Sequence, residues 1–275
     1  MNKNLDKTTV DSFGDEWERF NQSELSAEET QQIFDQYFKI FPWDSLPIKA
    51  EGFDMGCGSG RWARVIVKKV GHLNCIDPSN AIEVAKNSLA NFDNVSFFKK
   101  SVDEFSLDIG SQDFGYSLGV LHHVPDTAKA IQECSALLKP GAPFLMYLYY
   151  ALETQSILYK SLWKCSDYLR KIICRLPSGI KHLVTDFLAI ILYFPLARIA
   201  FLIEKLGISV TGFPLSFYRN CSFYTMRTDS RDRFGTPLEQ RFTQSEIKEL
   251  MLQSGFKNIV FSESEPKWCV VGIKS

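Results

Sequence analysis

Three glycines alternate with small residues directly after an acidic residue, a combination that can hold a nucleotide-like ligand. Asp54 is followed by Gly56, Gly58 and Gly60, and an apolar helical pattern begins at once after them. Glycine lets the backbone adopt positive φ and approach a ligand closely, because it has no Cβ. The N-terminus of a following helix offers free N–H groups and partial positive charge to a carboxylate or phosphate. The stretch 50–62 therefore predicts a strand, a glycine turn and a helix that bind a nucleotide-type ligand.

The spacing of these glycines separates the turn from the dinucleotide-binding fingerprint. That fingerprint is G-x-G-x-x-G, whereas the glycines here follow G-x-G-x-G, with an acid two residues before the first of them. The chain also has no recognisable hydride-transfer set of Tyr and Lys or of Ser. An NAD-dependent oxidoreductase is therefore the less favoured enzyme.

A second acid, Asp77, ends the apolar run 72–77 and follows Gly60 by 17 residues. An acid at the end of the second strand of a nucleotide-binding unit can accept two hydrogen bonds from a ribose diol. The offset is close to the ~20 residues typical of such sites. The alternative is that Asp77 caps a helix over 79–90.

Two histidines and three tyrosines follow later strands. His122 and His123 come after the fourth expected strand, and histidine is the natural proton acceptor near neutral pH. Side-chain alternation points Tyr147 and Tyr149 to the same side of the fifth strand, and together with Tyr150 they are candidates for substrate contact. The alternatives are that a histidine packs or hydrogen-bonds structurally and that the tyrosines belong to the core.

Short apolar runs alternate with helical patterns and must position these residues. After a first strand ending near Asp54, strands are expected over 72–77, 95–99, 113–118, 143–149, 257–262 and 268–273, and helices over 61–70, 81–90, 126–138, 153–175, 183–206 and 243–254. This alternation predicts βαβ units, a parallel sheet and right-handed crossovers. Ligands bind at the carboxyl ends of the strands in such sheets, so the strand-end residues should line one crevice.

Five ordered segments resemble the motifs of class I S-adenosylmethionine-dependent methyltransferases. Within this class, they are most similar to the ubiquinone/menaquinone-biosynthesis-like group. They cover about 50–150. FDMGCGSGRWA is similar to the first motif, NCIDPS to the ribose-binding acid motif, FFKKSVDEF to the adenine-contact segment, DFGYSLGVLHHVPD to the fourth-strand motif and ALLKPGAPFLMYLYY to the fifth-strand motif.

The resemblance implies an α/β fold with a Rossmann-like, doubly wound sheet of seven strands, the last antiparallel, with S-adenosylmethionine as cofactor and S-adenosylhomocysteine as product. Many members of the family have Asp where Ser101 stands, so a side-chain contact to the adenine from this position stays open. The implied cofactor contacts are Asp54, Gly56, Gly58 and Gly60 at the methionine portion, Asp77 at the ribose, Pro78, Ser101 and Val102 at the adenine, and Leu118 at the methionine amino group.

Four regions are expected along the chain. Residues 1–48 form an N-terminal helical flap, and 49–150 form the cofactor-binding core. Residues 151–240 form a mostly helical insertion after the fifth strand, which serves as a lid and includes Tyr218 as a candidate substrate contact. A C-terminal helix and two strands over 241–275 complete the core.

The insertion is locally basic and apolar. Lysines and arginines dominate 160–182, and the following uncharged run between Asp186 and Arg198 is shorter than the ~20 residues that a membrane span needs. We therefore expect a buried or interfacial helix there. The basic side chains form a solvated helix face, or else they meet an anionic substrate or a membrane surface. Peripheral membrane contact through 160–205 is thus one alternative.

Composition narrows the class of protein. A formal net charge of −1 over 275 residues gives no basic field for nucleic acid,. The seven cysteines show no metal-ligand spacing, so no metal site is expected,. No secretory signal is visible at the N-terminus, which predicts a cytoplasmic protein. The oligomeric state stays open.

The residues and the resemblance together predict methyl transfer to a small-molecule metabolite. Oxygen is favoured over nitrogen as the acceptor atom, because a hydroxyl must lose its proton and the histidine pair can take it. One alternative is methylation of a lipid-like or prenylated substrate at a membrane surface. Another is a catalytically silent protein that binds S-adenosylmethionine.

Overall fold

The computed structural model describes residues 3–104, 107–153, 156–210, 212–264, 266 and 268–275, with the side chain of Leu158 excepted. Phe105 of the expected adenine-contact segment and Thr154 and Gln155 of the expected helix 153–175 lie outside these residues. Two compact units divide the chain. We call them the core unit, which comprises Met1–Asn21, Gln31–Thr154 and Leu238–Ser275, and the helical unit, which comprises Gln22–Thr30 and Gln155–Pro237.

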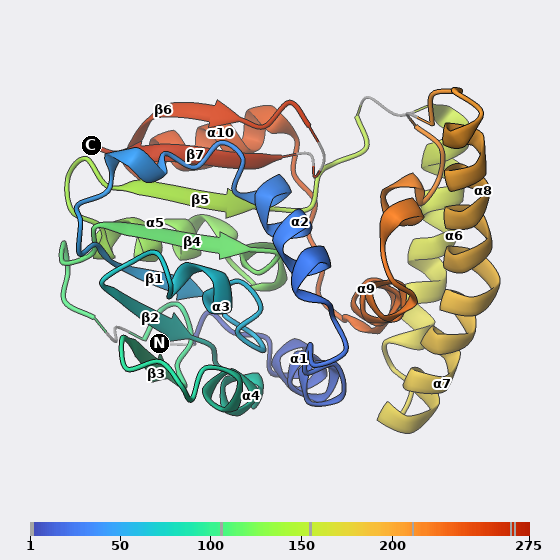
Figure 1. Cartoon of the computed structure of the whole chain (residues 1–275), viewed down its shortest axis with the longest axis horizontal. Coiled ribbons are helices and arrows are strands. Elements are labelled where there is room, and N and C mark those ends of the chain that lie inside the picture. Colours follow the sequence, from blue (N-terminus) through green and yellow to red (C-terminus); the bar gives the residue numbers. More distant parts are fainter. Residues whose placement is uncertain (1–2, 105–106, 154–155, 211, 265, 267) are drawn as a thin grey trace. The chain divides into compact units, whose positions relative to one another are not determined.

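The core unit contains a seven-stranded sheet in the order β3-β2-β1-β4-β5-β7-β6 (Figure 1). The strands are β1 Glu51–Met55, β2 His72–Ile76, β3 Val95–Phe98, β4 Phe114–Leu118, β5 Pro143–Tyr147, β6 Phe256–Phe261 and β7 Cys269–Lys274. Neighbours among the first five strands pair in parallel, while β7 runs antiparallel to both β5 and β6. The predicted doubly wound sheet with an antiparallel last strand is confirmed. Its topological switch point lies between β1 and β4.

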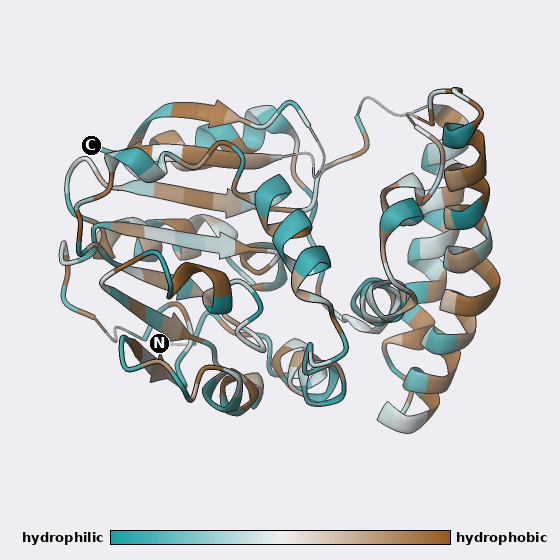
Figure 2. Cartoon of the chain, viewed as in Figure 1, coloured by the Kyte–Doolittle hydropathy of each residue, from teal (hydrophilic) through white to brown (hydrophobic). Residues whose placement is uncertain are grey.

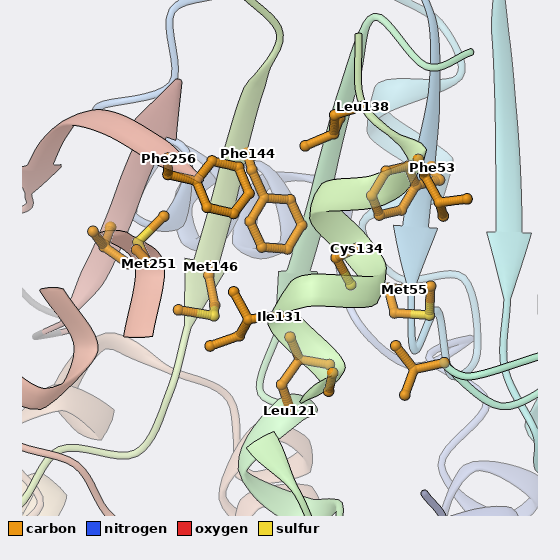
Figure 3. Packing of buried hydrophobic residues seen from close by; sticks show 14 of the residues in the cluster. Phe53, Met55, Leu121, Ile131, Cys134, Leu138, Phe144, Met146, Met251 and Phe256 are labelled. Atoms are coloured by element: carbon orange, nitrogen blue, oxygen red, sulfur yellow. The ribbon is translucent and has the colours of Figure 1, made fainter. Parts of the chain in front are cut away.

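Strand residues alternate between two hydrophobic clusters, as the pleat of a sheet requires. Phe144 and Met146 of β5 belong to one cluster and Leu145 to the other. Figure 3 shows the first cluster, in which the rings of Phe53, Phe144 and Phe256 join β1, β5 and β6, with neighbouring ring centroids 6.0 and 5.5 Å apart. Burial of both faces explains why β5 is a continuous apolar run,.

The helices of the core unit are α1 Lys7–Arg19, α3 Ala63–Ile66, α4 Ala81–Ser88, α5 Thr127–Leu137, α10 Gln244–Gln253 and most of α2 Ala27–Tyr37. Thr243 starts α10 with a capping box, in which its hydroxyl accepts from the Glu246 N–H and the Glu246 carboxylate accepts from the Thr243 N–H,. Helix α3 is shorter than the expected 61–70. At both of its ends the hydrogen bonds are of the 3-10 type: the Val65 N–H donates to the Trp62 carbonyl, and the Lys69 N–H donates to the Ile66 carbonyl,.

The helical unit holds α6 Ile157–Ile173, α7 Ser178–Leu188, a π-helical turn Ala189–Tyr193, α8 Phe194–Lys205, a 3-10 turn Ser216–Asn220 and α9 Phe223–Gly235. The chain from Ser178 to Lys205 is one continuous helix, which begins earlier than the expected 183–206 because Pro177 fits just before a first turn,. Helix α9 was not predicted. Its buried side chains include Thr225, Thr228 and Arg231, so no apolar stripe marks it in the sequence,.

Candidate functional site

The glycine turn after β1 can be made only by glycine. Gly56, Gly58 and Gly60 have φ values of +82, +52 and +77°. A Cβ on Gly56 would lie 2.4 Å from Val120 Cγ2, and the Gly56 N–H donates to the Ile76 carbonyl over 2.7 Å. The turn is thereby held against the ends of β2 and β4, where its backbone can face a ligand.

Asp77 connects this turn to the start of α4. Its Oδ2 accepts a hydrogen bond from the Gly58 N–H over 2.9 Å, and its Oδ1 accepts from the Ser79 N–H and hydroxyl over 2.8 and 2.6 Å. The Ser79 hydroxyl in turn accepts from the Ala81 N–H. A carboxylate offers about four lone-pair positions, so three of these contacts leave limited capacity for a ribose diol. The carboxylate therefore supports the local fold as well as facing the expected ligand position.

Asp54 is a buried carboxylate at the carboxyl end of β1. It accepts a hydrogen bond from the Tyr116 hydroxyl over 2.9 Å. Burial raises the pKa of Asp54 to about 8, although the Tyr116 hydrogen bond opposes this shift; the negative charge of Asp77 adds to it. A buried carboxylate of this kind is stabilised by a cation placed beside it, so the position favours a ligand with an ammonium or sulfonium group.

We expect binding of such a cation to release a proton from Asp54. The pKa is raised above the unfolded value of 3.8. The stability that protonated Asp54 contributes is therefore complete below that value and is lost as pH rises through about 8,. At pH 7, calorimetry in buffers of different ionisation enthalpy should detect release of about one proton on cofactor binding. Asp54→Asn should abolish the release, and a binding enthalpy independent of the buffer would contradict the assignment.

The N-terminal segment crosses the carboxyl edge of the strands. Trp17 on α1 places its indole nitrogen 3.1 Å from the point where a Cβ of Gly58 would lie. Asn4 exchanges two hydrogen bonds with the backbone of Asp126, over 2.7 and 2.8 Å. The sequence predicts a helical flap over 1–48. The contacts of α1 put Trp17 directly at the glycine turn, a position that fits a flap over a cofactor and equally a helix that packs on the body.

The strand-end residues after β3 and β4 differ in what their side chains do. The Ser101 hydroxyl lies 2.7 Å from Asp103 Oδ1 and 2.9 Å from Glu104 Oε2, so it is engaged in its own turn. Val102 packs in the first hydrophobic cluster. Leu118 and Pro78 are half-buried. Any adenine contact from Ser101 would therefore come from its backbone.

His122 and His123 lie in a 3-10 turn after β4 and have different surroundings. His122 is completely buried, and within the described part of the chain neither of its ring nitrogens has a hydrogen-bond partner. Burial lowers its pKa well below the usual histidine value, and the charges of His123 and Arg241 lower it further. His123 donates from Nδ1 to the Leu238 carbonyl over 2.6 Å. His122 is therefore a neutral imidazole at physiological pH.

An aromatic row connects these histidines to Tyr147 at the end of β5 and to Tyr149 just after it. Neighbouring ring centroids in the row lie between 3.9 and 6.0 Å apart. Tyr147 and Tyr149 point to the same side, as alternation predicts, whereas Tyr150 lies against Trp268. The row consists, in spatial order, of Tyr37, Tyr147, Tyr149, His122, His123 and Phe13.

The segment Leu238–Phe242 borders this row, and the sequence did not indicate it. Its backbone donates from Gln240 to the His122 carbonyl and from Phe242 to the Tyr149 carbonyl, over 3.0 and 2.9 Å. The Arg241 guanidinium lies 5.1 Å from the centroid of the Tyr149 ring. No periodic pattern marks this segment, because its contacts join residues far apart in the sequence.

Tyr218, the candidate from the insertion, lies in the helical unit. Its ring packs within that unit, 5.2 Å from the ring of Tyr193 and 5.2 Å from that of Phe217. Tyr218 therefore packs against neighbouring aromatic rings, which is the alternative to contact with a substrate. Across the residues that the structure describes, no group of three or more His, Cys, Asp or Glu side chains is placed to hold a metal ion.

The sheet order, the glycine turn and the ordered motifs identify a class I S-adenosylmethionine-dependent methyltransferase domain, as the motifs predict. Residues 53–146 match the family described as "Methyltransferase domain". The match stops at the end of β5 and so covers the cofactor half of the core unit. The chain therefore carries a methyltransferase domain of this class.

Curated relatives agree with this class, and a solved structure shares the fold. Ubiquinone biosynthesis O-methyltransferases of Saccharophagus degradans and Marinobacter nauticus are 37% and 33% identical over 91 and 93 residues, which is 32% of this chain. The aligned part spans 39% of the length of each relative. An O-methyltransferase family protein from Burkholderia thailandensis has the same fold, with a TM-score of 0.55 at 13% identity over 94% of this chain and 59% of that one.

Proposed function

We propose that the protein transfers the methyl group of S-adenosylmethionine to a hydroxyl oxygen of a small-molecule acceptor. The observation that carries this proposal is the neutral, buried imidazole of His122 in the aromatic row at the end of β4. A hydroxyl must lose its proton as the methyl group is transferred, and a neutral imidazole can accept it. The name of the bacterial relatives, ubiquinone biosynthesis O-methyltransferase, supports oxygen as the acceptor atom.

The residues of the core unit fit S-adenosylmethionine. The glycine turn provides close backbone approach, Asp54 offers a buried carboxylate to a cationic group, and Asp77 retains capacity for a hydroxyl of the ribose. When bound, the cofactor supplies a methyl group already activated on a sulfonium. The protein then has to hold the acceptor in line with that methyl group and remove a proton.

Arg241 and the aromatic row favour a planar acceptor whose oxygen becomes negative. The Arg241 guanidinium lies beside the Tyr149 ring. It is paired with Glu239 over 2.8 Å and donates to the Tyr150 carbonyl over 3.2 Å, so its remaining N–H groups are the ones that can stabilise an anionic oxygen,. The tyrosine rings offer flat apolar surfaces on which an aromatic acceptor can stack. Phenols, catechols and hydroquinones have both properties.

We expect tritiated S-adenosylmethionine to label phenolic acceptors but not aromatic amines of the same shape. The readout is the site of the methyl group in the product, determined by mass spectrometry. Calorimetric binding of S-adenosylmethionine, expected in the micromolar range, serves as the control that the cofactor site is intact. Transfer to the amines alone would overturn the assignment to oxygen. Micromolar binding without transfer to any acceptor would favour the catalytically silent alternative.

A further inference from the structure

The helical unit exposes an unusual amount of apolar surface. In the part of the chain that the structure describes, all exposed large hydrophobic side chains except Ile48, Ile109, Leu252 and Val260 lie between residues 157 and 208. Figure 2 shows that hydrophobic residues predominate along α7 and α8. Soluble proteins rarely expose apolar patches that continue over several helices, and such patches mark interaction surfaces. We call this surface the apolar face.

The continuous helix Ser178–Lys205 contributes most of the apolar face. It is the one helix among the described residues that is long and apolar enough to cross a membrane, and 22% of its most apolar window is buried. Leu183 and Phe187 are 72% and 59% exposed. The expectation that this helix is buried is therefore wrong, while the expectation of an interfacial helix remains.

Large and small residues are distributed on this helix in the reverse of the usual order. Ala189, Ala197 and Ala200 are completely buried, and Tyr193 is the one large apolar residue that the described helix buries, while Leu183 and Phe187 point outward. In water, burial of the large side chains would stabilise the unit most. Small residues at helix contacts and large apolar residues outside are typical of helices that face lipid.

Polar groups of the same helix point into the helical unit, where they are paired. Asp186 accepts two hydrogen bonds from the Arg227 guanidinium, over 3.2 and 3.1 Å. Arg198 donates to the carbonyls of Arg219 and Cys221, over 3.1 and 3.2 Å. With these charges satisfied inside the unit, the outward side of the helix over 187–197 carries no charge and can enter an apolar environment,.

Helix α6 adds a basic stripe beside its own exposed apolar residues. Lys164 and Lys171 are exposed on α6, and Arg175 is exposed in the turn that directly follows the helix. Asp167 is the only acid in the sequence between residues 157 and 182, and its carboxylate is shared between Arg170 and Lys171. A helix with apolar and basic stripes side by side matches the boundary between acyl chains and anionic headgroups.

We propose that the helical unit docks on the surface of an anionic lipid bilayer through the apolar face, with the basic stripe of α6 at the headgroups. The reversed placement of large and small residues argues for lipid as the occupant, and the excess of positive charge argues for an anionic surface. Docking of this kind is independent of methyl transfer, so vesicle binding tests it separately from the proposed activity.

Flotation of the full chain with vesicles is the test. The protein should float with vesicles of phosphatidylcholine and phosphatidylglycerol, and more weakly with phosphatidylcholine alone. The double substitution Phe187→Glu and Ile191→Glu, at positions 59% and 52% exposed, should weaken binding about a hundredfold, because two large apolar contacts are lost. The matched control is Leu252→Glu with Val260→Glu, at core-unit positions 53% and 54% exposed, and it should bind like the wild type.

The electrostatic part has its own pair of variants. Lys164→Gln with Arg175→Gln should lower affinity for the anionic vesicles roughly tenfold and leave binding to phosphatidylcholine unchanged. Lys248→Gln with Lys257→Gln, two exposed lysines of the core unit, is the control. Equal binding of wild type and the Phe187/Ile191 variant, or no flotation of the wild type, would overturn the proposal. A vesicle-free dimer that the same double substitution dissociates, without vesicle binding, would assign the face to a second copy instead.

Discussion

Replacement of Asp77 by alanine is expected to weaken S-adenosylmethionine binding about a hundredfold or more. Each hydrogen bond to a charged group contributes about 1.5–3 kcal/mol, and the substitution removes the acceptor for the ribose. It also leaves the Gly58 N–H, which donates to Asp77 Oδ2 over 2.9 Å, without that acceptor, so the glycine turn loses its anchor. Isothermal calorimetry measures the affinity directly.

Two further variants separate the parts of this effect. Ser79→Ala removes one donor to Asp77 Oδ1 and leaves the carboxylate in place, so we expect cofactor affinity to stay close to that of the wild type. Asp77→Asn keeps the shape but not the charge, and it should bind with intermediate affinity. Thermal unfolding of each variant reports whether the turn is intact. Equal affinity of Asp77→Ala and wild type would remove Asp77 from the site.

Replacement of His122 by phenylalanine is expected to lower kcat roughly 10²–10⁴-fold, the range for loss of a general base. The ring would keep its place beside Tyr149, whose centroid lies 3.9 Å from that of His122. Because neither nitrogen of His122 has a hydrogen-bond partner among the described residues, the substitution removes no such bond and should not destabilise the fold. Affinity for S-adenosylmethionine should be unchanged.

His123→Gln tests the neighbouring imidazole, since an amide can still donate to the Leu238 carbonyl. If His122 is the base, this variant should retain most of the activity.

The wild-type kcat should also stay constant through the pH range in which histidines usually titrate and decline only at lower pH, because the pKa of His122 is lowered well below 6.5. Unchanged kinetics in both variants would exclude a histidine base.

The parts of the fold that could be predicted from sequence are those with local causes. Strand ends, the glycine turn and the capping box of α10 follow from patterns within a few residues. Helix α9 could not be found this way, because the residues that it buries include Thr225, Ser230 and Arg231. Its inward side mixes these polar residues with Met226 and Phe234, so no continuous apolar stripe marks the inner side of the helix.

The same distinction between local and distant causes applies to the residues of the candidate site. The sequence indicated Asp54 and Asp77 because each ends a strand next to the switch point. It gave no indication that Trp17 lies at Gly58 or that Arg241 lies over Tyr149. These contacts depend on where distant segments meet, and neither composition nor spacing records that. The additional bonds from Asp77 to Gly58 and Ser79 likewise become visible only when the turn is built.

An isolated β-bridge pairs Tyr150 with Phe242, and its position bears on how the insertion joins the core unit. The Ala151 N–H donates to the Phe242 carbonyl, and the Phe242 N–H donates to the Tyr149 carbonyl, over 2.6 and 2.9 Å. The chain therefore leaves the core unit and returns to it at neighbouring points, although about ninety residues lie between them. Insertions are tolerated where the two ends of a segment already meet. The core unit can thus accommodate a different inserted unit at this junction while β5 and the histidine turn stay in place.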